Sequence, residues 1–154
     1  LRLQLSYSFQ LRELISQAND LCRSLDSLLS QLRERQELLT KAKNSQAEEV
    51  TKRLTEVQKQ ALELEDKLVR PEGKPFWSVG PRLVGQLNQL FRAIDGVDAR
   101  PTPAQLELFN ELRREFQQVK NEVRSFLVDE IPRLNKFLQK KKVPVLLIPR
   151  ANEE

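Results

Sequence analysis

Apolar residues recur along the first third of the chain at alternating steps of four and three. The series is Tyr7, Leu11, Leu14, Ala18, Leu21, Leu25, Leu28 and Leu32. This spacing places side chains on one face of an α-helix, so it predicts a helix over about residues 5–43. Further apolar residues such as Ile15 and Leu29 widen the stripe, which favours a helix with two neighbours over a two-stranded coiled coil.

A second stripe runs from Val50 to Leu68 and predicts a helix over about residues 46–69. Ser45 and Glu48 have the spacing of a capping box, in which the serine hydroxyl accepts a hydrogen bond from the glutamate amide. We therefore expect Ser45 to cap this helix. The short turn before it predicts an antiparallel helical hairpin.

The third stripe predicts a helix over about residues 81–95, ended by Asp95 and Gly96. Gly85 lies inside this segment. Glycine costs a helix roughly 1 kcal/mol relative to alanine, so we expect Gly85 to mark a close contact with another helix.

The segment DARPTPAQ predicts the start of a new helix. Thr102 suits the N-cap position, Pro103 the first helical position, and Gln105 completes a second capping box. The helix that follows should span residues 103–139. Its stripe slips at the 4-4 step ending at Ile131, and Pro132 removes a backbone donor, so we expect a kink near residues 128–132.

These elements predict an all-α fold, an elongated antiparallel up-down-up-down four-helix bundle over residues 1–139. Short irregular extensions should flank it: LRLQL alternates like a strand, and residues 140–154 form a basic and apolar tail. Both ends could dock on another domain. For the tail, we favour folding back onto the bundle's own groove.

Charge and composition narrow the function classes. The net charge of +4 divides into +1 for residues 1–70, +1 for 71–139 and +2 for the tail, with no basic stripe of the kind nucleic acid needs. The chain has no histidine and one cysteine, Cys22. Catalytic triads, histidine-containing metal sites and internal disulfides are thereby excluded. We expect Cys22 to be a small buried apolar group. We expect no cofactor, no metal and no catalytic residue.

The acidic clusters at Glu48–Glu49 and at residues 63–66 lie mostly off the apolar stripe among lysine and arginine. This placement indicates a solvated, ion-paired surface rather than acid/base catalysis. No apolar run approaches the length of a membrane span. Lys140–Lys142 beside VPVLLIP would give only weak anchoring to a membrane surface.

Two segments are candidates for interaction. The first, RPEGKPFWSVGP, contains Phe76 and Trp77. We expect these two rings to pack against one end of the bundle; the alternative is that they bind a partner surface. The tail contributes the other candidates, Val145, Leu146, Leu147 and Ile148.

The order of three segments resembles a known family. They are QLRELISQANDLCRSLDSLLSQL, then RLVGQLNQLFRAIDGVDARPTPAQLELFNEL, then FLVDEIPRLNKFL. This order resembles the helical C-terminal region of bacterial proteins whose earlier part is a β-propeller of BNR (Asp-box) repeats, often labelled glycosyl hydrolase-like or sortilin-like. The resemblance covers nearly the whole chain. The Asp-box signature itself is absent, so no catalytic residue carries over.

The resemblance implies a non-catalytic accessory or interaction domain, with the propeller of the parent chain or a second copy as its protein partner. It also implies an extracytoplasmic location. Because the chain begins at Leu1 rather than methionine, we expect a segment of a longer protein. The alternative that the heptads permit is a free-standing coiled-coil scaffold or adaptor.

Overall fold

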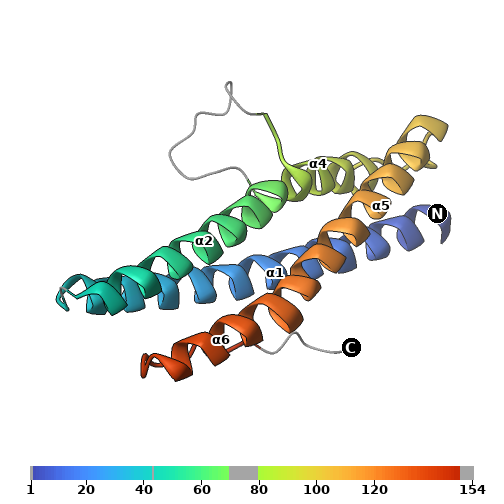
Figure 1. Cartoon of the computed structure of the whole chain (residues 1–154). Coiled ribbons are helices and arrows are strands. Elements are labelled where there is room, and N and C mark those ends of the chain that lie inside the picture. Colours follow the sequence, from blue (N-terminus) through green and yellow to red (C-terminus); the bar gives the residue numbers. More distant parts are fainter. Residues whose placement is uncertain (1, 43, 70–79, 150–154) are drawn as a thin grey trace. The chain divides into compact units, whose positions relative to one another are not determined.

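The computed structural model describes residues 2–42, 44–69 and 80–149, and these are all-α, without a β-strand. Long helical stretches pack against each other, as the sequence predicted. The helices are α1 (Arg2–Thr40), α2 (Ser45–Leu68), α4 (Leu83–Asp95), α5 (Pro103–Ser125), the π-helical turn η1 (Phe126–Glu130) and α6 (Ile131–Lys140), labelled in part in Figure 1.

The chain divides into two compact units, each assembled from both halves of the sequence. Unit 1 comprises Leu1–Cys22 with Asp66–Asn121, and unit 2 comprises Arg23–Glu65 with Glu122–Glu154. The divisions fall inside α1 and α5 and near the end of α2. Each unit therefore depends on contacts between residues far apart in the sequence.

Unit 1 has a core of mainly leucine and aromatic side chains from the start of α1, the end of α2, α4 and α5. Tyr7 of α1 meets the buried Phe109 of α5 edge to face, with ring centroids 5.0 Å apart, a favoured arrangement of aromatic rings. Its buried apolar residues are Leu11, Ala18, Leu68, Leu83, Leu87, Leu90, Ile94, Phe109, Leu112, Phe116 and Val119.

Polar contacts tie the same elements of unit 1 together. Gln4 Nε2 donates to the carbonyl oxygens of Ile94, at 2.9 Å, and of Val97. Ile94 lies in the last turn of α4, where helix carbonyls have no partner within the helix. Gln4 therefore caps the C-terminal end of α4 from α1. Lys120 Nζ of α5 also donates to Gln17 Oε1 of α1, at 3.0 Å.

Unit 2 has a mostly aliphatic core formed by α1, α2, the end of α5, η1, α6 and the segment after α6. Between α1 and α2, Gln36 Nε2 donates to Gln58 Oε1 at 3.0 Å. The buried apolar residues of this unit are Leu25, Leu28, Leu29, Leu32, Ala47, Val50, Leu54, Val57, Ala61, Val123, Phe126, Leu127, Ile131, Leu134, Leu138 and Leu146.

A π turn lies where the sequence predicted a kink. The Ile131 amide donates to the carbonyl of Phe126, five residues earlier in the chain. In a regular α-helix the acceptor lies four residues earlier. Pro132 has no amide hydrogen, so the carbonyl of Val128 loses its usual partner one helical turn later. The wider turn accommodates the 4-4 step of the stripe, and Leu127 and Ile131 both remain buried.

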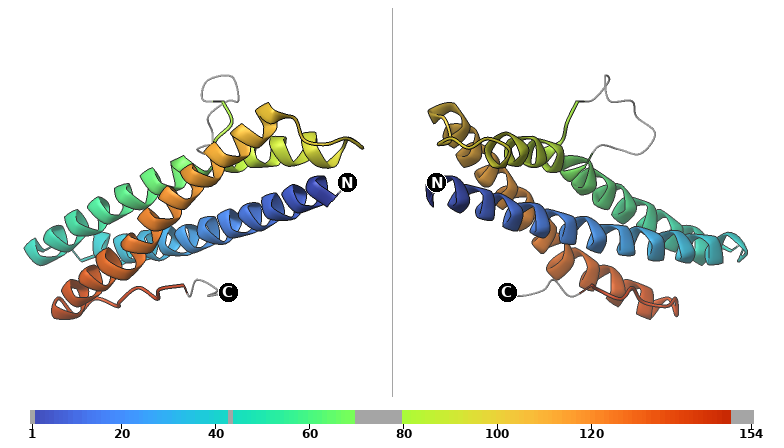
Figure 2. Two further views of the ribbon diagram at one scale, coloured as in Figure 1. Left: turned by 90° about the vertical axis from the view of Figure 1, so that its right-hand side faces the viewer. Right: turned by 180° about the vertical axis from the view of Figure 1, so that it is seen from behind.

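The chain reverses direction directly after α6 (Figure 2). Lys142 has a φ of 58°, its amide donates to Gln139 O at 3.2 Å, and the Val143 amide donates to Leu138 O at 2.9 Å. This pair of bonds is the Schellman arrangement, which usually has glycine at the left-handed position. The turn brings residues 143–149 back as an irregular segment, so the predicted fold-back of the tail is confirmed for these residues.

Helix caps confirm one sequence prediction and correct another. The Thr102 amide donates to Gln105 Oε1 at 2.9 Å, and the Gln105 amide donates to Thr102 Oγ1 at 3.2 Å, so this capping box is present. Ser45, in contrast, does not cap α2 and is its first residue. The cap is Asn44, whose Oδ1 accepts from the Ala47 amide at 2.7 Å. Asparagine is as good an N-cap as serine. Here the Asn44 carboxamide, and not the Ser45 hydroxyl, accepts the hydrogen bond from the third helical amide.

Three other expectations are wrong in detail. Residues 2–5 are helical rather than strand-like, because no proline or glycine interrupts α1 and Gln4 holds its first turns to α4. The nearest neighbour of an added Gly85 side chain is Pro81, at 3.3 Å, and not another helix. Cys22 is half-buried rather than buried.

Candidate functional site

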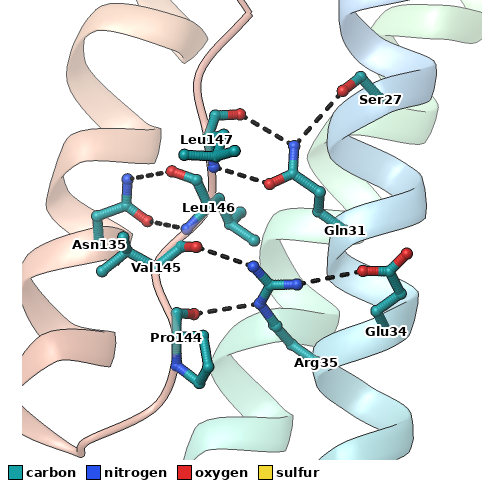
Figure 3. Close-up of polar contacts among 9 residues, drawn as sticks. All are labelled: Ser27, Gln31, Glu34, Arg35, Asn135, Pro144, Val145, Leu146 and Leu147. Carbon is teal, nitrogen blue, oxygen red and sulfur yellow. Dashed lines mark hydrogen bonds and ion pairs between the residues drawn. The ribbon is translucent and has the colours of Figure 1, made fainter.

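The tail segment after α6 is held by polar side chains from two helices of unit 2. We call residues 143–149 the strap, and Gln31, Arg35 and Asn135 the clamp. Figure 3 shows the strap passing between Asn135 of α6 on one side and Gln31 and Arg35 of α1 on the other. The clamp makes six hydrogen bonds to the strap, all of them to main-chain atoms.

Two carboxamides pair with two successive residues of the strap. Asn135 Nδ2 donates to Leu146 O at 2.9 Å, and its Oδ1 accepts from the Leu146 amide at 2.7 Å. Gln31 pairs in the same way with the main chain of Leu147, at 2.9 and 2.7 Å. Successive residues of an extended chain direct their main-chain groups to opposite sides. A carboxamide on each side therefore satisfies both residues, as a neighbouring strand would.

Arg35 binds the strap one step earlier. Its Nε donates to Pro144 O at 3.2 Å and its Nη2 donates to Val145 O at 2.9 Å. The remaining nitrogen, Nη1, lies 3.3 Å from Glu34 Oε2. Because charged donors make stronger hydrogen bonds than neutral ones, Arg35 is the strongest single polar contact that the clamp offers.

Leu146 is the only fully buried side chain of the strap. Leu146 is 2% exposed, whereas Leu147 is 76% exposed and Val145 and Ile148 are also exposed. Of the residues that the sequence singled out for interaction, Leu146 therefore belongs to the core of unit 2 and the other three lie on the surface. Phe76 and Trp77 lie outside the described residues.

A second candidate surface lies on the first turns of α1 in unit 1. Leu5 is 63% exposed and Phe9 is 65% exposed. Leu3 is exposed as well, but it lies two residues before Leu5 and therefore on another side of the helix. Leu5 and Phe9 are four residues apart, so they lie one above the other on the helix. We call Leu5 and Phe9 the α1 apolar face. Arg12, one turn further, stacks over the ring of Phe91, with its guanidinium carbon 5.3 Å from the ring centroid.

Several acidic side chains in the described ranges pair with neighbouring cations. Glu49 Oε2 lies 3.1 Å from Lys141 Nζ, and Asp66 Oδ1 lies 3.5 Å from Arg82 Nη2. Within these ranges no group of three or more cysteine and acidic residues is arranged to hold a metal ion. None of the helices there combines the length and the apolar character needed to cross a membrane.

Sequence reasoning missed the three clamp residues. They are ordinary polar residues of helices, and only their positions carry a signal. Gln31 precedes the buried Leu32, and Asn135 follows the buried Leu134, so both flank the apolar stripe. Once a fold-back of the tail was expected, amide side chains beside the stripe were its natural main-chain partners.

No protein-family model matches this chain, and neither a curated protein nor a solved structure matches it. The resemblance to proteins with BNR repeats therefore stays a prediction.

Proposed function

We propose that this chain is a non-catalytic helical interaction domain, the C-terminal segment of a longer polypeptide whose earlier part is a β-propeller of BNR repeats. In this proposal the α1 apolar face packs against the propeller. The helices are arranged up-down-up-down, which the short turn at residues 41–44 and the restart at Thr102–Pro103 support.

The observation that carries the proposal is the exposure of Leu5 and Phe9. Scattered apolar residues are common on protein surfaces, but these two lie on consecutive turns of one face of the same helix. Protein interfaces are enriched in aromatic side chains and arginine, and Arg12 lies one turn beyond Phe9. Packing this face against another domain removes its largest apolar side chains from water.

The pairing of acidic residues supports a structural rather than a catalytic role. Carboxylates that act as acids or bases are held by burial or by like charges so that their pKa values change. Glu49, Asp66 and Glu130 instead lie beside Lys141, Arg82 and Arg133. This is the pattern of a charged surface that keeps a helical domain soluble.

The first test is the gene sequence upstream of the Leu1 codon. Several Asp-box repeats, of the form Ser-x-Asp-x-Gly-x-x-Trp, would support the proposal. A start codon directly upstream, or only further heptads, would overturn the propeller assignment and leave a scaffold or adaptor.

The second test measures the interface. The upstream propeller, made as a separate polypeptide, is titrated with this chain in a calorimeter. We expect binding by the wild-type chain and its loss in the double variant Leu5→Ser, Phe9→Ser. A matched control is Leu62→Ser, which changes an exposed leucine in unit 2. Equal binding by the double variant and the wild type would show that the α1 apolar face is not the interface.

A further inference from the structure

We propose that the clamp is a binding site for an extended peptide segment in trans, and that its occupant is the strap of a second copy of this chain. The two copies would exchange straps reciprocally. Each clamp would then make with its partner the contacts that it makes here with its own strap.

The clamp binds main-chain groups, so it can bind another segment that presents the same groups at the same spacing. Its six hydrogen bonds involve the carbonyls of Pro144 and Val145 and both main-chain groups of Leu146 and Leu147. The one buried strap side chain is Leu146. The site therefore selects an extended segment with two successive main-chain amides and a leucine at the first of them, a form of recognition used for added strands. A second copy presents the same groups at the same spacing.

The strap itself is suited to bind as a separate segment. Pro144 has no amide hydrogen, and the clamp uses only its carbonyl, so no donor is left unpaired at that residue. Proline also fixes its own φ and biases the residue before it toward extended conformations, which lowers the entropy lost on binding. Because Val145, Leu147 and Ile148 are exposed, removal of the strap takes only one side chain of its own out of the core.

The hinge between α6 and the strap favours opening. Lys142 adopts a left-handed φ of 58° to close the turn, a conformation that is unfavourable for residues with a β-carbon. In an exchanged dimer this turn can extend, which relieves the backbone strain while the clamp contacts are remade. Exchange of an identical element between protomers is a low-cost route to dimers.

The first experiment supplies the strap as a free peptide. A fluorescent peptide of residues 143–149 is titrated against the 154-residue chain and followed by anisotropy. The Leu146→Ala variant weakens the resident strap, so we expect it to bind the peptide at least about ten-fold more tightly than the wild type does. Leu147→Ala is the matched control and should bind the peptide as the wild type does, because Leu147 is exposed.

Two changes test the main-chain contacts directly. A peptide N-methylated at the residue equivalent to Leu147 cannot donate to Gln31 and should bind more weakly. Adding Gln31→Ala and Asn135→Ala to the Leu146→Ala chain should abolish binding. If the Leu146→Ala chain keeps its helical circular dichroism and binds no peptide, or binds both peptides equally, the proposed site is overturned.

The second experiment identifies the occupant. The mass of the wild-type chain is measured by light scattering over a range of concentrations, and we expect a dimer to form as the concentration rises. Lys142→Gly removes the strain of the closed turn and should shift the equilibrium toward monomer. Monomer at every concentration would overturn the second copy as the occupant. Leu5→Ser with Phe9→Ser should leave the strap-exchanged dimer intact, which separates this result from the α1 apolar face of the proposed function.

Discussion

Apolar residues at the start of α1, in unit 1, differ in solvent exposure from those further along the same helix, in unit 2. At the start of α1, in unit 1, Leu5 and Phe9 are exposed, and the contacts to neighbouring elements come from Gln4 and Tyr7. Toward the end of α1, in unit 2, Leu28, Leu29 and Leu32 are buried, and Gln31 and Arg35 bind the strap. In unit 2 the chain's own tail thus binds to this part of α1, although Leu38 near the end of the helix is exposed. In unit 1 Leu5 and Phe9 form an exposed face on consecutive turns.

The largest expected effect separates core from surface within unit 1. Phe109→Ala removes a fully buried ring that meets Tyr7, and we expect it to lower the free energy of unfolding by about 3–5 kcal/mol. Phe9→Ala should change it by less than about 0.5 kcal/mol, because Phe9 is exposed. Urea denaturation followed by circular dichroism measures both. A large loss for Phe9→Ala would mean that the α1 apolar face is already packed, and the contrast between the units would fail.

The next effect tests how firmly the strap belongs to unit 2. We expect Leu146→Ala to lower the free energy of unfolding by about 2 kcal/mol, the low end for a buried leucine, because the strap can detach before the helices unfold. Leu147→Ala should lie within about 0.5 kcal/mol of the wild type. Thermal and urea unfolding of the two variants would decide the point, and equal effects would show that the strap binds through its hydrogen bonds alone.

Helix caps give a smaller effect that compares the two units directly. Asn44→Ala in unit 2 and Thr102→Ala in unit 1 should each lower the free energy of unfolding by about 1 kcal/mol. Ser45→Ala is the control and should cost much less, since Asn44 accepts the hydrogen bond from the Ala47 amide. A greater loss for Ser45→Ala than for Asn44→Ala would restore serine as the cap of α2.

The smallest expected effect is a gain. Lys142→Gly relieves the left-handed backbone at the end of α6, and glycine also makes the unfolded chain more flexible. The net result should be a stabilisation of about 0.5 kcal/mol, measured by urea unfolding at a concentration where the chain is monomeric. Lys142→Ala keeps the β-carbon and should show no gain. A loss of stability in the glycine variant would contradict the Schellman turn described for this position.

The sequence predicted well what depends on near neighbours. The capping box of Thr102 and Gln105 and the end of α4 at Gly96 follow from residues within one turn of each other. The choice between Asn44 and Ser45 failed because both residues are good caps one position apart, and only the local backbone decides between them.

The clamp was harder to predict because its residues meet only in the folded chain. Gln31 and Leu147 are separated by 116 positions, and no spacing rule connects a glutamine in a helix with the main chain of a distant tail. Leu146 was identified as an interacting residue from its apolar surroundings. Its burial within unit 2 follows from the reversal at Lys142, a left-handed residue that the sequence does not mark with glycine.

The π turn at Phe126–Glu130 also has a genetic consequence. It acts as an insertion of one residue into an otherwise continuous helix, and each residue of an α-helix adds about 100° of rotation. The wide turn absorbs the rotation that this extra residue would otherwise add, so deletion of a single codon within η1 would restore regular winding and leave Asn135 on its present face. The same deletion in the regular part of α5 would instead rotate α6 and turn Asn135 and the base of the strap away from their present positions.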